Sequence, residues 1–346
     1  VSRGRSCAAP THPGHRPQPS RRARIRRVPP AAAGRGGLLG AGCKRRRKAF
    51  QWPAQMSDAP SIHSFSHDAL GSKFWVRIAD EDAVYARNAA EAMFQRLDEV
   101  AALSAASEGG PVALVNALGA GASCQVTEDF RSVWDFASSF RDDTGGAFDV
   151  TAGALFRYWQ SRGEASFDPD DSAWAAAMKS NREGRLASEG DRITCVRAGR
   201  TVDFGAVLRG FALDRMADLL ENTWGIHRAL IMASGSVTLT LDPPGDSNGW
   251  RIGVGPEKEM RLCRYALASR SGALVDARSG TRASTQGPVR TLATSALEAE
   301  AIAAAAVLLS PAEVEELVNR GCSRGAWLAD GTKSGSLGYY EITDRA

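Results

Sequence analysis

The sequence lacks several features that would assign it to a protein class at once. It has no apolar run of about 18 residues, the length that a membrane-spanning helix needs, so it predicts no membrane span. Its six cysteines are scattered, with no CxxC pair, which argues against a zinc site or a disulfide framework and favours isolated thiols. It contains no internal repeat, and this excludes a repeat architecture.

Acidic residues are absent from residues 1–55, which hold 14 of the 43 lysines and arginines. The rest of the chain carries 29 basic and 39 acidic residues, so the net charge of +4 does not indicate nucleic-acid binding by the folded part. The basic segment is rich in Pro, Gly, Ala and Arg. It has too few large apolar side chains to offset the entropy of ordering, and we expect it to be disordered.

Residues 1–55 admit several interpretations. Lys44–Lys48 is a basic patch for nucleic acid or phosphate, Ser20–Ile25 resembles a twin-arginine export signal, and Leu38–Cys43 resembles a lipoprotein cleavage site. Arg35 inside the short apolar stretch argues against export. We expect a dispensable leader or an over-extended start, with translation from Met56 and one domain over residues 56–346. The chain is cytoplasmic in that case, and periplasmic or lipid-anchored if the leader is an export signal.

The hydrophobic pattern of the remaining chain mixes helices and strands. It predicts a small-residue turn region over Glu108–Gly121 and a hairpin that pairs Arg192–Val196 with Arg200–Phe204. The other predicted elements are strands at Ser72–Ile78, at His227–Asp242 with a break at Ser234–Ser236, and at Trp250–Pro256, a strand pair in the C-terminal tail, and helices at Glu81–Ser104, from Thr127 to Gly145, after Asp168, and at Ser295–Leu309. This mixture indicates an α+β fold, with helices packed on mainly antiparallel sheets.

The segment Thr144–Leu155, TGGAFDVTAGAL, places a carboxylate, a hydroxyl and backbone N–H groups at one turn. Such a turn can hold a ribityl or ribose hydroxyl on Asp149, with Phe148 packed against it. The alternative is structural. In that case Asp149 and Thr151 cap the next helical turn and Phe148 belongs to the core.

The segment Val202–Asn222 begins VDFGAVLRG and runs into a helix. Asp203 and Arg209 flank Gly205, and a helix N-terminus favours an anion. Because a guanidinium binds phosphate bidentately and keeps its charge, Arg209 is a candidate phosphate ligand. The alternative is an ion pair between Asp203 and Arg209 across the turn.

Glu300 and Ala304 lie four residues apart in the alanine-rich helix and therefore on one face. A carboxylate and a hydroxyl at that spacing make half of a Mg²⁺ site, but only the carboxylate is present here. The alternative is that Glu300 is an ordinary solvated helix residue.

These segments, in this order, resemble the ApbE-type FAD:protein FMN transferases from about Ala69 to the C-terminus. The matching stretches are ALGS (Ala69–Ser72), GGAFDVTAG (Gly145–Gly153), VDFGAVLRGFALDR (Val202–Arg215), SGS (Ser234–Ser236), ALVDARSG (Ala273–Gly280) and AEAIAAAA (Ala299–Ala306). VDFGAVLRGFALDR is the most specific of them. The resemblance implies a T-fold-like architecture of the ApbE type.

The resemblance also implies the activity and the site. The family transfers FMN from FAD to a Ser or Thr of an acceptor protein, with Mg²⁺. By resemblance the FAD-binding residues are Ala147, Phe148, Asp149, Thr151, Asp203, Arg209 and Val275, and the metal ligands are the carbonyl of Ala206 and the carboxylate of Glu300. The catalytic group is not identified.

The sequence departs from the family pattern mainly at residues that carry chemistry. Ala273 stands where the family has a His, Ala304 where it has a metal-binding Thr, and Glu300 where it has an Asp. Arg209 replaces a Lys, and the stretch from Tyr265 to Ala273 is shorter than usual. A flavin transferase is the first hypothesis. An FAD-binding pseudoenzyme of the same family, which keeps the pocket but does not transfer, is the second.

Overall fold

The computed structural model describes residues 61–104, 109–163, 166–255, 258–285, 287–322, 325–327, 333–334 and 342–344. The chain divides into two units, Val1–Met56 and Ser57–Ala346, and the described residues all lie in the second. The predictions for residues 1–55 and the start at Met56 lie outside the described residues. Within the described ranges, no helix has both the length and the apolar character to cross a membrane.

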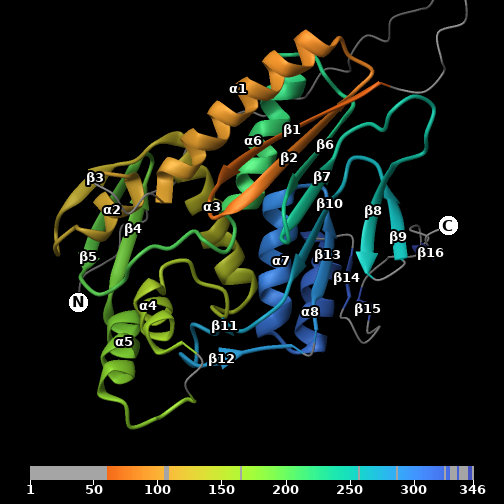
Figure 1. Cartoon of the computed structure of the whole chain (residues 1–346). Helices are drawn as coiled ribbons and strands as arrows, with labels where there is room; N and C mark the ends of the chain where they lie inside the picture. Colours follow the sequence, from red (N-terminus) through yellow and green to blue (C-terminus); the bar gives the residue numbers. More distant parts are fainter. Residues whose placement is uncertain are drawn as a thin grey trace, which may run out of the picture. The chain divides into compact units, whose positions relative to one another are not determined.

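An eight-stranded antiparallel sheet is the main framework of the described unit (Figure 1). In spatial order its strands are β1 (Ile62–Ala69), β2 (Ser72–Ala79), β6 (Ala229–Ala233), β7 (Val237–Thr240), β10 (Ala266–Arg270), β13 (Val289–Ala293), β14 (Gly325–Trp327) and β15 (Lys333–Ser334). The break predicted at Ser234–Ser236 is the turn between β6 and β7, where Gly235 has a φ of 74°. The prediction of an α+β fold with antiparallel sheets is confirmed.

Three smaller sheets complete the strand inventory of the described residues. Their strands are β3 (Ser123–Gln125), β5 (Arg192–Arg197) and β4 (Arg185–Glu189) in one, β16 (Ile342–Asp344), β9 (Lys258–Leu262) and β8 (Trp250–Gly255) in another, and β11 (Leu274–Val275) and β12 (Arg282–Ala283) in the third. The predicted hairpin is wrong, because β5 pairs with β3 and β4 and not with Arg200–Phe204. The turn of the real hairpin is at Gly190, whose φ of 59° favours glycine.

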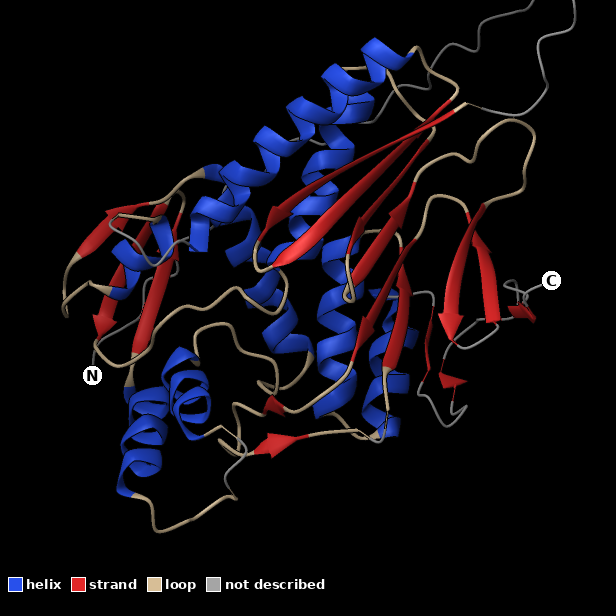
Figure 2. Ribbon diagram, viewed as in Figure 1, coloured by secondary structure: helices blue, strands red, loops and turns tan. Residues whose placement is uncertain are grey.

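The helices are marked in blue in Figure 2. They are α1 (Ala83–Ala101), α2 (Pro111–Asn116), α3 (Glu128–Asp143), α4 (Gly153–Arg162), α5 (Ser172–Glu183), α6 (Leu208–Asn222), α7 (Ala296–Leu308) and α8 (Pro311–Leu317), with a 3₁₀ turn at Ala102–Ser104 and a π turn at Val318–Cys322. Asp82 and Thr127 cap α1 and α3 with their side chains, as the sequence predicts for Thr127. The helix α2 corrects the prediction of a turn region over Glu108–Gly121.

Helices α1, α6 and α7 pack together with the main sheet in the largest hydrophobic core. Helix α7 is buried on all sides, which its alanine side chains permit because they let neighbouring backbones approach closely. The closest approach is at Gly210 of α6. A Cβ there would lie 2.4 Å from the Ala296 carbonyl oxygen, so only glycine fits between α6 and the start of α7.

Asp214 of α6 caps the N-terminus of α7. Its carboxylate accepts hydrogen bonds from the backbone N–H groups of Ala296 at 2.7 Å and Leu297 at 2.9 Å, and from the Ser295 hydroxyl at 2.9 Å. The start of α7 is thus fixed by the neighbouring helix as well as by Ser295, the cap that the sequence predicts.

The Asp214 carboxylate is buried, and its burial predicts that the stability of the chain depends on pH. Burial raises the pKa of Asp214 from 3.8 to about 6. The folded chain therefore binds this proton more tightly than the unfolded chain, and the contribution of Asp214 to the free energy of unfolding falls as the pH rises from about 4 to about 6. The shift corresponds to about 3 kcal/mol. We expect Asp214→Asn to remove this dependence. Between about pH 4 and pH 6 the free energy of unfolding of the wild type should therefore fall by about 3 kcal/mol relative to that of the variant.

Urea unfolding at pH 4, 5 and 6.5 measures this difference. Asp135→Asn is the control, because Asp135 is an exposed carboxylate on α3. A difference between wild type and Asp214→Asn that does not change with pH would contradict the prediction.

Candidate functional site

A cavity of about 300 Å³ lies where two loops, the end of β10, the segment leading into β11 and one face of α7 meet. Five of the nine predicted site residues line it, and so do both alanines at which the sequence departs from the family pattern. These residues are Phe148, Asp149, Asp203, Ala206 and Val275, together with Ala273 and Ala304. Four of the six matching stretches therefore contribute residues to one cavity, and Ala69–Ser72 and Ser234–Ser236 do not line it.

The two loops are joined by backbone hydrogen bonds. The N–H of Asp203 donates to the Val150 carbonyl at 2.7 Å, and the N–H of Gly153 donates to the Thr201 carbonyl at 2.9 Å. A parallel bridge joins Ala152 to Thr201. The loop before α4 and the loop before α6 are thereby held side by side at the cavity.

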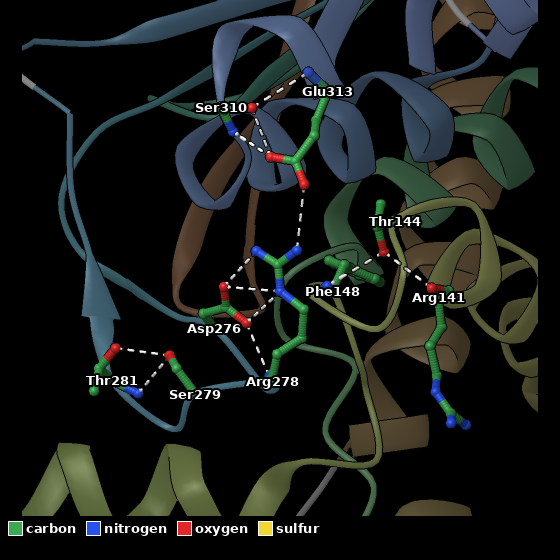
Figure 3. A network of polar contacts seen from close by, with 9 residues as sticks. All are labelled: Arg141, Thr144, Phe148, Asp276, Arg278, Ser279, Thr281, Ser310 and Glu313. Carbon is green, nitrogen blue, oxygen red and sulfur yellow. Dashed lines mark hydrogen bonds and ion pairs between the residues drawn. The ribbon is translucent and has the colours of Figure 1, made fainter. Parts of the chain in front are cut away.

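Phe148 is positioned by the end of α3 (Figure 3). Its backbone N–H donates to Thr144 Oγ1 at 3.3 Å, and the Thr144 hydroxyl donates to the Arg141 carbonyl at 3.1 Å. The Phe148 ring packs edge-on against Phe140, with 5.2 Å between the ring centroids. Phe148 is thus a core residue, as the structural alternative predicts, and it also lines the cavity.

Asp149 is almost fully buried, with 4% of its surface exposed, and its carboxylate is already engaged. Oδ1 accepts from the Thr151 N–H at 2.8 Å and from the Thr151 hydroxyl at 2.6 Å, which is the turn that the structural alternative predicts. Oδ2 contacts the Arg200 guanidinium and lies 3.4 Å from Arg141 Nε. Sequence reasoning missed both arginines, since nothing in their spacing relates them to Asp149.

Asp203 and Arg209 do not form the ion pair that the structural alternative predicts. The Asp203 carboxylate accepts from the N–H of Gly205 at 2.7 Å and stays exposed at the cavity. Arg209 turns to Glu300 instead, with 3.4 Å between Arg209 Nε and Glu300 Oε1. Arg209 therefore lies next to the cavity, and is not among the residues that line it.

Glu300 is buried, with 2% of its surface exposed, so the alternative of a solvated helix residue is wrong. Besides Arg209, its carboxylate accepts the Gly210 N–H at 2.7 Å and the hydroxyl of Ser236. Gly210 lies in the first turn of α6, where the N-cap residue Val207 provides no side-chain hydrogen bond. Glu300 thus caps α6 from α7, as Asp214 caps α7 from α6, and also fixes the β6–β7 turn.

Val275 reaches the cavity from a tightly bonded loop. The Asp276 carboxylate accepts from Nε and Nη2 of Arg278, with the shortest contact at 2.7 Å, and Arg278 also reaches Glu313 on α8 at 3.4 Å (Figure 3). The N–H of Ala277 donates to the Ala147 carbonyl at 3.2 Å. Ala147 is buried and does not line the cavity, but its carbonyl connects the Phe148 turn to the Val275 loop.

Arg270 is a cavity residue that sequence reasoning missed. It ends β10, lines the cavity, and donates from Nη1 to the Ala206 carbonyl at 3.0 Å. Burial lowers the pKa of its guanidinium, the charge of Glu300 opposes that effect, and the charge of Arg209 adds to it. The one available signal is the shortened stretch between Tyr265 and Ala273, in which Arg270 lies.

The oxygen atoms around the predicted metal position do not suit a Mg²⁺ ion. The Ala206 carbonyl already accepts from Arg270, the Glu300 carboxylate already has three donors, and Ala304 provides no oxygen. Two guanidinium groups lie where a divalent cation needs oxygen ligands. In the described part of the chain, no group of three or more His, Cys, Asp or Glu side chains could hold a metal ion.

An aromatic wall bounds the cavity on the side of α4. Phe156 and Trp159 line it together with Arg282, whose guanidinium lies 4.7 Å from the Trp159 ring centroid. The Trp159 indole N–H donates to the Gly280 carbonyl at 2.9 Å, which fixes the ring. This wall gives the cavity an apolar surface for a planar ring.

A second cavity, of about 600 Å³, shares Asp149 and Val150 with the first and is also lined by Thr151. Its other lining residues include Arg141, Arg182, Arg185, Arg197 and Arg200. It is larger and more basic than the first, but of the predicted site residues it contains only Asp149 and Thr151.

Comparison with known proteins assigns this fold and these motifs to one family. The model of the ApbE family matches residues 70–326. The FAD:protein FMN transferase of Treponema pallidum (strain Nichols) is 25% identical over 193 residues, which is 49% of this chain and 53% of that protein. The match thus spans about half the length of the curated relative.

Solved structures share the fold. The apo form of Pseudomonas stutzeri flavinyl transferase ApbE superposes with a TM-score of 0.65 and 21% identity, over 83% of this chain and 95% of that one. The flavin transferase ApbE from Vibrio cholerae gives a TM-score of 0.68 and 17% identity, over 83% of this chain and 98% of that one.

Proposed function

Because this chain belongs to the ApbE family, we propose that it is a flavin transferase that moves FMN from FAD to a serine or threonine of an acceptor protein. The observation that carries the proposal is the convergence of Phe148, Asp203 and Val275, from three separate motifs, on one cavity. The Treponema pallidum relative bears the name of this activity.

The cavity suits the flavin end of FAD. Phe148, Trp159 and Val275 provide an aromatic and apolar wall for the isoalloxazine ring. The exposed carboxylate of Asp203 can accept hydrogen bonds from ribityl or ribose hydroxyls. Asp149 is less free for this task, because Thr151, Arg141 and Arg200 already occupy its oxygens.

The cavity also suits the diphosphate. Gly205 lies at this end of the cavity, between Asp203 and the start of α6, where Glu300 already accepts the Gly210 N–H. Arg270 adds a guanidinium at the same end of the cavity. Arg209 supports this end through Glu300. The Thr151 carbonyl accepts from the Thr201 N–H and so holds the two loops together, and the Ala147 carbonyl joins the Phe148 turn to the Val275 loop.

The reaction itself is a substitution at phosphorus. The acceptor hydroxyl oxygen forms a bond to the phosphorus of the FMN half, and the bond from that phosphorus to the bridging oxygen breaks. AMP leaves with the bridging oxygen and its electron pair. Ala273 offers no basic group at the cavity, so the hydroxyl proton leaves to water or to the exposed Asp203 carboxylate. The positive charge at the diphosphate end stabilises the charge that develops on the leaving phosphate.

A transfer assay with the full chain tests the proposal. The chain is incubated with FAD and an acceptor domain that a characterised ApbE flavin transferase modifies, with and without Mg²⁺, and the acceptor is then denatured. We expect yellow fluorescence on the acceptor band and a mass increase equal to one FMN residue. An acceptor in which the target Ser or Thr is replaced by Ala is the control. FAD binding without any covalent flavin would contradict transfer and support the pseudoenzyme alternative.

A further inference from the structure

The predicted metal position contains a surplus of positive charge from the protein itself. Arg209 and Arg270 both lie near Glu300, which is the buried carboxylate of this group. Within this group, two guanidinium groups and one carboxylate leave one net positive charge. The Asp203 carboxylate also lines the cavity, but it is exposed and accepts from the Gly205 N–H. A buried charge without a counterion is costly, so this arrangement calls for an anionic ligand.

Arg270 has donors left for such a ligand. A guanidinium carries five N–H donors, and within the described residues the contact of Arg270 is the one from Nη1 to the Ala206 carbonyl. That contact fixes the side chain at the carbonyl that the family resemblance assigns to the metal. Arg270 also lines the cavity, so a ligand there is next to a guanidinium with unused N–H groups.

The small side chains next to this position leave room for a guanidinium group. Ala273 and Ala304 line the cavity with side chains that are methyl groups, so these side chains supply no oxygen ligand and leave room for a planar guanidinium. The position thus lacks the oxygens that Mg²⁺ needs and contains an arginine, whose fork of N–H groups matches phosphate oxygens.

From these contacts we propose that Arg270 takes the place of the divalent cation, so that the chain binds the diphosphate of FAD without a metal ion. This inference rests on the proposed function, because it names the group that meets the diphosphate in the same cavity. Arg209 and Glu300 form an ion pair next to the cavity, and Arg270 contacts the diphosphate.

The test measures FAD affinity by titration calorimetry, with the purified full chain in excess EDTA and again in excess Mg²⁺. We expect the two dissociation constants to agree within about twofold. Arg270→Ala is expected to weaken FAD binding by about 10- to 100-fold in both buffers, since it removes charge-assisted hydrogen bonds to phosphate. Riboflavin, which has no phosphate, should bind the variant and the wild type about equally.

Arg290→Ala is the matched control, because Arg290 lies on the adjacent strand β13, paired with Ser269, and does not line the cavity. Its FAD affinity should stay within about twofold of the wild type. Arg270→Lys keeps the charge without the fork and should recover part of the affinity.

The outcomes separate the inference from the proposed function. FAD binding by the wild type that requires Mg²⁺ would overturn the inference and leave flavin transfer intact. Equal loss of riboflavin and FAD affinity in Arg270→Ala would also overturn it, because the effect would then be structural. Absence of FAD binding in both buffers would overturn the inference and the proposed function together.

Discussion

Gly210→Ala is expected to destabilise the chain by about 3 kcal/mol or more, although glycine to alanine inside a helix ordinarily stabilises by up to about 1 kcal/mol. The reason is the contact between α6 and α7. The added Cβ would lie 2.4 Å from the Ala296 carbonyl oxygen, 2.6 Å from its carbon and 2.8 Å from the Leu297 nitrogen. These are backbone atoms at the capped start of α7 and cannot move aside cheaply.

The same substitution also reaches the candidate site. The Gly210 N–H is one of the donors to Glu300, so separating α6 from α7 would weaken that contact and shift Arg209. Urea unfolding followed by circular dichroism measures the loss of stability. Gly119→Ala is the matched control, because nothing lies within 4 Å of a Cβ at Gly119. If Gly210→Ala were as stable as the wild type, the close packing of α6 on α7 would be refuted.

Glu300→Ala is expected to cost about 3–5 kcal/mol of stability, because it removes one partner of a buried ion pair. It leaves the Arg209 guanidinium without its carboxylate, and the Gly210 N–H and Ser236 hydroxyl without their acceptor. Glu300→Gln keeps an acceptor oxygen but no charge, so we expect its loss of stability to be smaller than that of Glu300→Ala.

Chemical denaturation of Glu300→Ala and Glu300→Gln measures the two losses of stability. Glu316→Ala on α8 is the control, because Glu316 forms an exposed ion pair with Arg320 and such pairs contribute at most about 1 kcal/mol. If Glu300 served chiefly as a ligand for a bound metal, its replacement would change stability little in metal-free buffer. A loss as small as that of Glu316→Ala would therefore contradict the structural role of Glu300.

The sequence predicts the elements whose signals are local. The strand at Ser72–Ile78 and the helix at Ser295–Leu309 are confirmed, because alternation, helical spacing and a capping serine act over a few residues. The mistaken hairpin shows the limit of this reasoning. Gly184 and Gly199 bring the segment before Thr201 against the end of α5, where a Cβ on Gly184 would lie 2.4 Å from the Arg200 nitrogen. That contact depends on the tertiary fold, and no local pattern reveals it.

The candidate site divides in the same way. Phe148, Asp203 and Val275 lie in motifs and were predicted, and the structure places them at one cavity. Arg200 and Arg270 were missed because their partners, Asp149 and the Ala206 carbonyl, are far away in the sequence. Charge pairs of this kind depend on which chain segments become neighbours, and a single sequence does not provide that information.

The most direct test of the account is a crystal structure of the full chain with FAD. We expect the isoalloxazine ring in the cavity between Phe148 and Val275, and the diphosphate within hydrogen-bonding distance of the Arg270 guanidinium. FAD bound instead in the larger cavity among Arg182, Arg185 and Arg197, with the cavity at Phe148 empty, would contradict it.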